Sequence, residues 1–347
     1  MNCVSGGAGN RSPFIVACPV TEQRYSLDYP AVRGFNYQPS YGRTGFEIWQ
    51  LFDAAVVDQE LGRGKAYFPQ INAVRLWLSW ESFTRGPERF LDNFEAALAI
   101  ASRHDLLVMP VLFNRWHSML ADYGGIYIDH FMPGISSVPP DRRFGPYLEE
   151  VVGRHAADPR IFAWDLCNEP FSYAGAPGAI AEIVAAELGW LTDSYDTCKR
   201  LGAVAPVTVG IHANHGLDGF RQIEPISDVL SIHPYWPDKP PNRIPDKSIF
   251  EQRLDEYTAF AADTGKPLLA TETCWGAVDD LEHVEIIRYT LGQLKQRGIG
   301  WLAYVLHHSL TAYSYAPEFG PMSGSGNMSF IGADGAPRQG HEVFNEF

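Results

Sequence analysis

Two short apolar runs of the sequence each end in a glutamate. The first is IFAWDLCNEP, which places Asn168 and Glu169 before Pro170, and the second is PLLATETCWG, which stays apolar until shortly before Glu272. If both runs are parallel strands of one closed barrel, their carboxyl ends meet at the same mouth. A close pair of carboxyl groups suits the cleavage of a glycosidic bond, because one protonates the leaving oxygen while the other attacks the sugar or activates water.

A third apolar run, AVRLWLSW, contains a single arginine, Arg75. A guanidinium inside a buried strand needs an acidic partner, and a purely structural ion pair would satisfy that need. We favour Glu272 as the partner, because a neighbouring cation keeps a carboxylate ionised and a nucleophile must be ionised.

Histidines and cysteines raise two other kinds of chemistry. His212 and His215 are spaced i, i+3 and His307 is followed by His308, but no carboxylate cluster completes a metal site around them. The five cysteines show no CxxC spacing, so neither a disulfide framework nor a zinc site is predicted. We expect no metal and no organic cofactor.

Eight apolar runs of strand length are available to position these residues. They span residues 31–36, 71–78, 106–112, 161–167, 206–211, 228–233, 267–272 and 300–306. Helical patterns lie between them, such as the i, i+4, i+7, i+11 series that starts at Phe90 and ends at Ala101. This alternation predicts the α/β class and a single (β/α)8 TIM barrel.

The same pattern predicts how the chain is organised. We expect an N-terminal extension over residues 1–30 that packs on the barrel, followed by one catalytic domain over residues 31–347. Three long connections, 113–140, 234–247 and 307–337, follow predicted strands and should therefore lie on the carboxyl-end rim. Loops of this length without secondary structure are usually functional.

Charge and hydropathy exclude some partners. The net charge of -14 and the lack of clustered Lys and Arg argue against nucleic acid. The longest apolar runs, such as LLVMPVLF, are too short to span a bilayer, so no membrane association is expected. The N-terminal segment lacks a basic stretch followed by an apolar one, which predicts a cytoplasmic protein. These features do not predict an oligomeric state.

Five motifs stand in order along the chain: AVRLWLSW, WDLCNEP, SIHPYW, TETCWG and GIGWLAYVLHH. Together they resemble the clan A glycoside hydrolases, most closely the family 5 cellulase-like group, over nearly the whole predicted barrel. The resemblance implies a carbohydrate substrate and a retaining double displacement, in which Glu169 is the general acid/base and Glu272 the nucleophile.

The resemblance also implies supporting roles for polar residues near the pair. Asn168 would hydrogen-bond the sugar 2-hydroxyl, and Arg75 would keep Glu272 ionised. Tyr235 would donate a hydrogen bond to Glu272, and His233 would contact the substrate.

Aromatic residues would supply the sugar platform. Trp301 or Tyr304 would form the floor on which the sugar ring stacks, and Trp275 is a further candidate for stacking. Two positions depart from the family pattern, because Phe113 and Asn114 end the third strand where many members carry a histidine, and Tyr304 stands where a platform tryptophan is common.

The sequence therefore predicts a retaining β-glycoside hydrolase that cleaves a β-linked oligo- or polysaccharide with two glutamates. Two alternatives stay open. One is a barrel that binds carbohydrate without cleaving it, and the other is a metal-dependent barrel hydrolase that uses the histidines. The sugar, the linkage and the choice between endo and exo action are not predicted.

Overall fold

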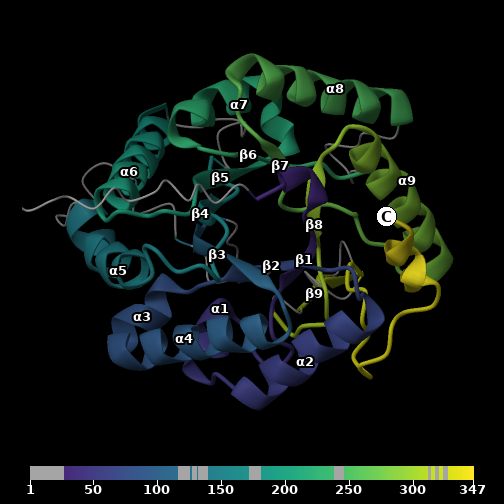
Figure 1. Cartoon of the computed structure of the whole chain (residues 1–347), viewed down its shortest axis with the longest axis horizontal. Helices are drawn as coiled ribbons and strands as arrows, with labels where there is room; N and C mark the ends of the chain where they lie inside the picture. The colour runs from purple at the N-terminus through teal and green to yellow at the C-terminus, as the bar shows by residue number, and fades with distance from the viewer. Residues whose placement is uncertain are drawn as a thin grey trace, which may run out of the picture.

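A computed structural model describes residues 27–115, 126, 131, 140–171, 181–237, 246–311, 314–316, 320–322 and 327–347. In these residues a parallel sheet closes on itself in the order β1 to β8, surrounded by helices (Figure 1). The strands are β1 (Arg33–Tyr37), β2 (Ala73–Trp77), β3 (Leu107–Asn114), β4 (Trp164–Asn168), β5 (Val207–His212), β6 (Leu230–His233), β7 (Leu268–Ala270) and β8 (Gly300–Ala303). The predicted (β/α)8 barrel is confirmed, and each predicted run overlaps one strand.

Helices connect the strands and cover the outside of the barrel (Figure 1). They are α1 (Gly45–Gln50), α2 (Ala54–Tyr67), α3 (Trp80–Arg85), α4 (Pro87–Arg103), α5 (Pro140–Arg154), α6 (Ala181–Arg200), α7 (Gly216–Ile223), α8 (Lys247–Thr264) and α9 (Asp280–Gln296). Aspartates cap the first turns of α2, α8 and α9 by accepting backbone N–H groups. The predicted apolar face of α4, from Phe90 to Ala101, is buried.

The interior of the barrel has three layers of different character. Its amino end is closed by apolar side chains, among them Val32, Ala73, Met109, Leu269 and Leu302. The carboxyl end carries an aromatic cluster that includes Trp77, Tyr235 and Tyr304. Between them lies a fully buried polar layer that contains Asn36, Arg75, Asp165, Thr208, Ser231 and Thr271. A separate apolar core fills the space between the sheet and the helices.

Several predicted segments differ in detail. The connection 307–337 contains two short antiparallel strands, β9 (Ser314–Ala316) and β10 (Gly320–Met322), so it is not a loop without secondary structure. Most of 113–140, most of 234–247 and most of the predicted extension 1–30 lie outside the described residues, so the packing of that extension stays a prediction. Within the described part of the chain, no helix combines the length and the apolar character that a membrane span requires.

Candidate active site

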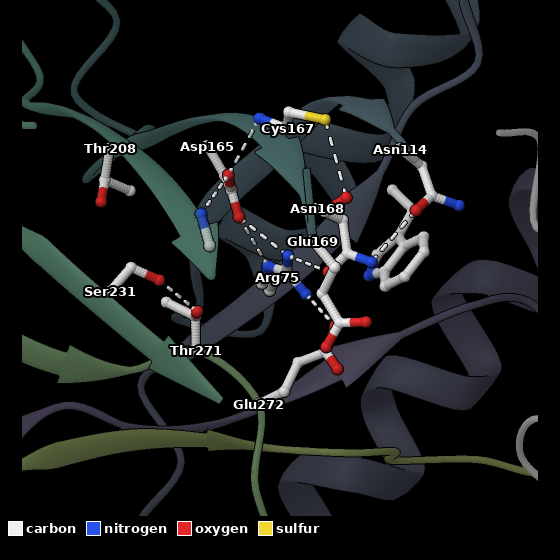
Figure 2. Close-up of polar contacts among 12 residues, drawn as sticks. Arg75, Asn114, Asp165, Cys167, Asn168, Glu169, Thr208, Ser231, Thr271 and Glu272 are labelled. Carbon is white, nitrogen blue, oxygen red and sulfur yellow. Dashed lines mark hydrogen bonds and ion pairs between the residues drawn. The ribbon is translucent and has the colours of Figure 1, made fainter. Parts of the chain in front are cut away.

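The two glutamates meet at the carboxyl end of the barrel (Figure 2). Glu169 directly follows Asn168, the last residue of β4, and Glu272 lies two residues beyond the end of β7. A carboxylate oxygen of each glutamate and a ring nitrogen of His233 all lie within 4.8 Å of one another. This spacing fits a retaining pair, whose carboxyl groups are about 5–5.5 Å apart, better than an inverting pair at about 6.5–9.5 Å.

Arg75 is the predicted partner of Glu272 and is fully buried inside the barrel. Its Nη1 donates to Glu272 Oε1 at 2.5 Å, and its Nη2 donates to Asp165 Oδ2 at 2.8 Å. Figure 2 shows Arg75 lying between these two acids. Burial alone would lower the pKa of Arg75, but the ion pairs with Asp165 and Glu272 raise it. Arg75 is therefore a permanent cation beside the candidate nucleophile.

Two asparagines complete the acceptors around Arg75. Nη2 donates to Asn168 Oδ1 and Nη1 donates to Asn36 Oδ1, each at 2.8 Å. Asn36 in turn donates from Nδ2 to the backbone oxygens of Thr271 and Leu302, which ties β1 to β7 and β8. The guanidinium is thus held by four side chains, so its position is fixed before any substrate binds.

An irregularity in β4 brings Asp165 and Asn168 to the same side of the sheet. Side chains alternate along a regular strand, so residues three positions apart face opposite ways. The β4–β5 register shifts between Asp165 and Asn168. Leu166 and Cys167 both join the outer apolar core, and Asp165 and Asn168 both reach Arg75.

Gly210 of β5 anchors β4 at this point. Its backbone oxygen accepts from the Glu169 N–H at 2.8 Å, and its own N–H donates to Asp165 Oδ1 at 3.1 Å. A Cβ atom at Gly210 would lie only 2.8 Å from His233 Nε2 and 3.0 Å from Asp165 Oδ2. Only a residue without a side chain fits here without displacing those groups.

Tyr235 hydrogen-bonds Glu272, and His233 lies against Glu169 with Glu272 Oε2 farther away, 3.6 Å from its Nδ1. The Tyr235 hydroxyl donates to Glu272 Oε2 at 2.7 Å, as predicted, and burial raises the pKa of Tyr235, which keeps the phenol protonated. His233 Nδ1 lies 2.7 Å from Glu169 Oε1, and burial lowers the pKa of His233 to about 4. Because His233 is fully buried, its expected contact with the substrate is replaced by this contact with Glu169.

The platform prediction is corrected at Trp301. This side chain is fully buried in the apolar core between the sheet and the helices, with the Arg33 guanidinium 3.6 Å above its ring, so it cannot stack on a sugar. Tyr304 belongs instead to the aromatic cluster at the mouth. Trp275 packs against the same cluster, with its ring centroid 5.3 Å from that of Tyr235. Tyr304 and Trp275 are therefore the platform candidates.

Asn114 fills the position at the end of β3 where the family pattern has a histidine. Its Oδ1 accepts from Asn168 Nδ2 at 3.0 Å (Figure 2). Phe113 beside it faces outward, into the apolar core between the sheet and the helices. Asn114 therefore orients Asn168, a role that the sequence did not predict.

The backbone is strained around both glutamates. Glu169 and Phe171 have φ values of 46° and 61°, and Cys274, close to Glu272, has 68°. Non-glycine residues rarely occupy this left-handed region, and each instance costs about 1–3 kcal/mol. Such strain clusters at functional sites, where the surrounding structure holds a side chain in an otherwise unfavourable position.

Residues of metal-ligand type form two groups within the described ranges. One is Glu169, His233 and Glu272, and the other is Glu95, His155 and Asp158 on the outside of the barrel. In the first group Arg75 and Tyr235 already donate to Glu272, and His233 Nδ1 lies 2.7 Å from Glu169 Oε1. In the second group Arg160 bridges the two acids. The histidines considered for a metal, His212, His215, His307 and His308, belong to neither group.

Four polar residues of the site were not predicted from the sequence: Asn36, Asp165, Ser231 and Thr271. Each is a buried polar side chain within or next to an apolar strand. That is the same signal that identified Arg75, and it would have identified these residues as well.

Relatives of the chain include carbohydrate-active enzymes. A protein named "Probable mannan endo-1,4-beta-mannosidase A-2" in Aspergillus terreus is 32% identical over 91 residues, or 24% of this chain and 22% of the relative. Mannan endo-1,4-beta-mannosidase A of Hypocrea jecorina is 24% identical over 182 residues, or 51% of this chain and 37% of the relative. This chain thus matches less than half the length of either relative.

Solved structures share the fold. An exo-beta-1,4-mannosidase from Opitutaceae bacterium strain TAV5 superposes with a TM-score of 0.69 at 18% identity, and the match covers 91% of this chain and 58% of that one. The family model described as Cellulase (glycosyl hydrolase family 5) matches residues 69–309, which is more than half of the sequence. With a closed (β/α)8 barrel and paired glutamates at its mouth, the chain belongs to glycosyl hydrolase family 5.

Proposed function

We propose that the protein is a retaining β-glycoside hydrolase that acts on β-1,4-linked mannosides. The observation that carries the proposal is the close Glu169 and Glu272 pair. Arg75 and Tyr235 donate to Glu272, whereas His233 lies against Glu169. Two carboxyl groups in different environments are suited to two different roles.

Glu272 is the nucleophile in this proposal. Arg75 donates to Oε1 and Tyr235 donates to Oε2, so both carboxylate oxygens are held by donors that stabilise negative charge. The carboxylate attacks the anomeric carbon while Glu169 gives its proton to the glycosidic oxygen, and a covalent glycosyl-enzyme forms. Glu169 then removes a proton from water, which attacks the same carbon and releases Glu272, so two inversions give net retention.

We assign to Asn168 a hydrogen bond to the sugar next to the scissile bond. Its Oδ1 accepts from Arg75 and one N–H of its Nδ2 donates to Asn114. The amide is therefore fixed in one orientation, and its second N–H is the donor we assign to the sugar 2-hydroxyl. Such a contact strengthens as the transition state develops.

The choice of β-1,4-mannosides is supported by the relatives. Both curated relatives are named as mannan endo-1,4-beta-mannosidases, and a structural neighbour is an exo-beta-1,4-mannosidase. Because the names include endo- and exo-acting enzymes, the position of cleavage is left to product analysis.

The decisive experiment follows fresh hydrolysis of β-1,4-mannotriose and mannohexaose by proton NMR, with cello-oligosaccharides of equal length for comparison. We expect the mannosides to be preferred and the first product to be the β-anomer. An initial α-anomer would overturn retention, and a preference for cello-oligosaccharides would overturn the substrate class. Binding without turnover would indicate a carbohydrate-binding barrel, and loss of activity with a chelator would indicate a metal-dependent one.

Variants of the two glutamates test their roles. Glu272→Ala should abolish turnover, and added azide should restore part of it as a glycosyl azide of inverted configuration, because azide enters the space of the missing nucleophile. Glu169→Ala with azide should give a retained product. The opposite pattern would mean that the two roles are exchanged.

A further inference from the structure

A chain of buried hydrogen bonds runs from Glu169 into the barrel interior. His233 Nδ1 contacts Glu169 Oε1, and His233 Nε2 lies 3.0 Å from Thr271 Oγ1. Thr271 Oγ1 in turn contacts Ser231 Oγ, as the dashed line in Figure 2 shows. His233, Thr271 and Ser231 are all fully buried, so the protein alone must satisfy their polar atoms.

The direction of these hydrogen bonds follows from counting donors. In the part of the chain that the structure describes, the only hydrogen-bond partner of Ser231 Oγ is Thr271 Oγ1. If Ser231 donates to Thr271 and Thr271 donates to His233 Nε2, every hydroxyl hydrogen has an acceptor. If His233 Nε2 carries the proton instead, one hydroxyl hydrogen is left buried without an acceptor, which is unfavourable.

We propose that Thr271, backed by Ser231, is a positioning residue that fixes His233 as the Nδ1–H tautomer, so that the acid form of Glu169 carries its proton on Oε2. The catalytic part of this inference rests on the proposed function. Because the Nδ1–H of His233 already points at Glu169 Oε1, a proton on Oε1 would face this N–H hydrogen and be repelled by it. The proton of the acid form therefore resides on Oε2.

The reaction steps then use Oε2 alone. In the first step the Oε2 proton passes to the glycosidic oxygen as that bond breaks, and Glu169 becomes a carboxylate. In the second step Oε2 accepts a proton from water as the water attacks the anomeric carbon. His233 donates to Oε1 throughout and neither gains nor loses a proton.

His233 can play this part because it stays neutral. The ionisable groups around it are Glu169, Glu272, Arg75, Asp165 and His212. Burial outweighs the attraction of the acids and lowers the pKa of His233 to about 4, so at neutral pH the ring adds no positive charge beside Glu169. A charged ring would stabilise the carboxylate form, so less of Glu169 would hold the proton that it must give to the leaving group.

Nitrogen-15 NMR of the labelled enzyme tests the tautomer directly, because protonated and unprotonated ring nitrogens have widely separated shifts. The His233 signals are identified by their loss in His233→Asn. We expect a protonated Nδ1 and an unprotonated Nε2 at pH 7, and a protonated Nε2 would overturn the proposal. This measurement needs no substrate, so it tests the tautomer even if the proposed function fails.

Kinetics of Thr271→Val test the consequence for catalysis. The variant keeps the shape of the side chain and removes the hydroxyl. On mannotriose, whose leaving group needs a proton, kcat/KM should fall about three- to tenfold, the range expected for one lost neutral hydrogen bond. On 2,4-dinitrophenyl β-mannoside, whose leaving group needs none, kcat/KM should stay the same.

Two matched variants serve as controls. Thr271→Ser retains the hydroxyl and should restore the mannotriose rate. Thr208→Val removes another buried hydroxyl of the barrel interior, one that donates to the Val229 backbone oxygen. This variant should change neither the ratio of kcat/KM between the two substrates nor the tautomer of His233. An equal loss on both substrates in Thr271→Val would overturn the catalytic role. If Thr271→Val does not fold, Ser231→Ala takes its place, with a smaller loss on mannotriose expected.

Discussion

Two arginines among the described residues, Arg75 and Arg115, are almost completely buried, and they lie in different regions. Arg75 lies inside the barrel, where it is paired with Glu272 and Asp165. Arg115 follows β3 and pairs with Glu187 of α6 at 2.7 Å, so it belongs to the layer between the sheet and the helices. Its guanidinium also lies 4.8 Å from the ring centroid of Phe131.

The difference shows that a buried ion pair does not by itself mark an active site. Glu187 is enclosed with Arg115 and joins a strand end to a helix. Glu272 lies at the barrel mouth and faces Glu169. Arg75 also pairs with two acids, Asp165 and Glu272, so more negative than positive charge surrounds it in this group of three residues. The first arrangement can tune a reacting group, and the second stabilises the fold.

The largest expected contrast is between Arg75→Met and Arg115→Met. Each removes one partner of a buried pair, which typically costs about 3–5 kcal/mol of unfolding free energy. Arg75→Met should also lower kcat/KM by about 10²–10³-fold and move the acidic limb of its pH profile to higher pH, because a carboxylate without its cation is protonated more readily. Arg115→Met should leave kcat/KM and the profile unchanged.

Urea unfolding measures the loss of stability, and kcat/KM measured between pH 4 and pH 9 gives the shift of the pH profile. Carboxyl and histidine groups titrate in about this range. Arg75→Lys keeps the positive charge but lacks the planar guanidinium, so its pH profile should lie closer to that of the original enzyme than the profile of Arg75→Met does. If Arg115→Met moved the acidic limb as far as Arg75→Met does, the contrast between the two regions would be wrong.

A smaller effect of opposite sign is expected from Asp165→Asn. The substitution removes one of the two acids that share Arg75, so the cation acts more fully on Glu272. The acidic limb of kcat/KM should therefore move to lower pH. A shift to higher pH would show that Asp165 acts mainly by aiming Arg75 rather than by sharing its charge.

The smallest effect on activity is expected at Trp301. Trp301→Phe removes volume from the outer core, so the protein should lose about 1–2 kcal/mol of stability while KM for mannotriose stays the same. Tyr304→Ala, at the mouth, should raise KM several-fold, because it removes the ring on which the sugar would stack. Thermal melts and initial rates distinguish the two, and a raised KM in Trp301→Phe would return that residue to the substrate platform.

Much of the site could be predicted because catalysis and folding favour different residue types. A glutamate or an arginine next to a buried strand is unfavourable unless something uses it, so Glu169, Glu272 and Arg75 stood out from their apolar neighbours. The barrel followed from the number of strands and their alternation with helices. The error at Trp301 was avoidable, because Leu302 and Tyr304 share one face of the chain and Trp301 must take the other.

Other features could not be read from the sequence. The bulge in β4 breaks the alternation that a reader would apply, and only the register with β5 shows Asp165 and Asn168 on the same side. The hydrogen bond between Thr271 and Ser231 joins the residue after β7 to β6 and depends on the pairing register of the two strands. Such a pairing joins residues far apart along the chain, so neither strand read by itself reveals it.

Gly210 makes the site particularly sensitive to substitution at this position. The residue has no side chain and so touches no sugar, yet the Arg75 cluster and the His233 chain approach each other across the space that its Cβ would occupy. Any substitution there would push on both networks at once. Substitutions at position 210 should therefore be expected to impair catalysis. From the residue type alone, a glycine in the middle of a strand would be expected to tolerate substitution.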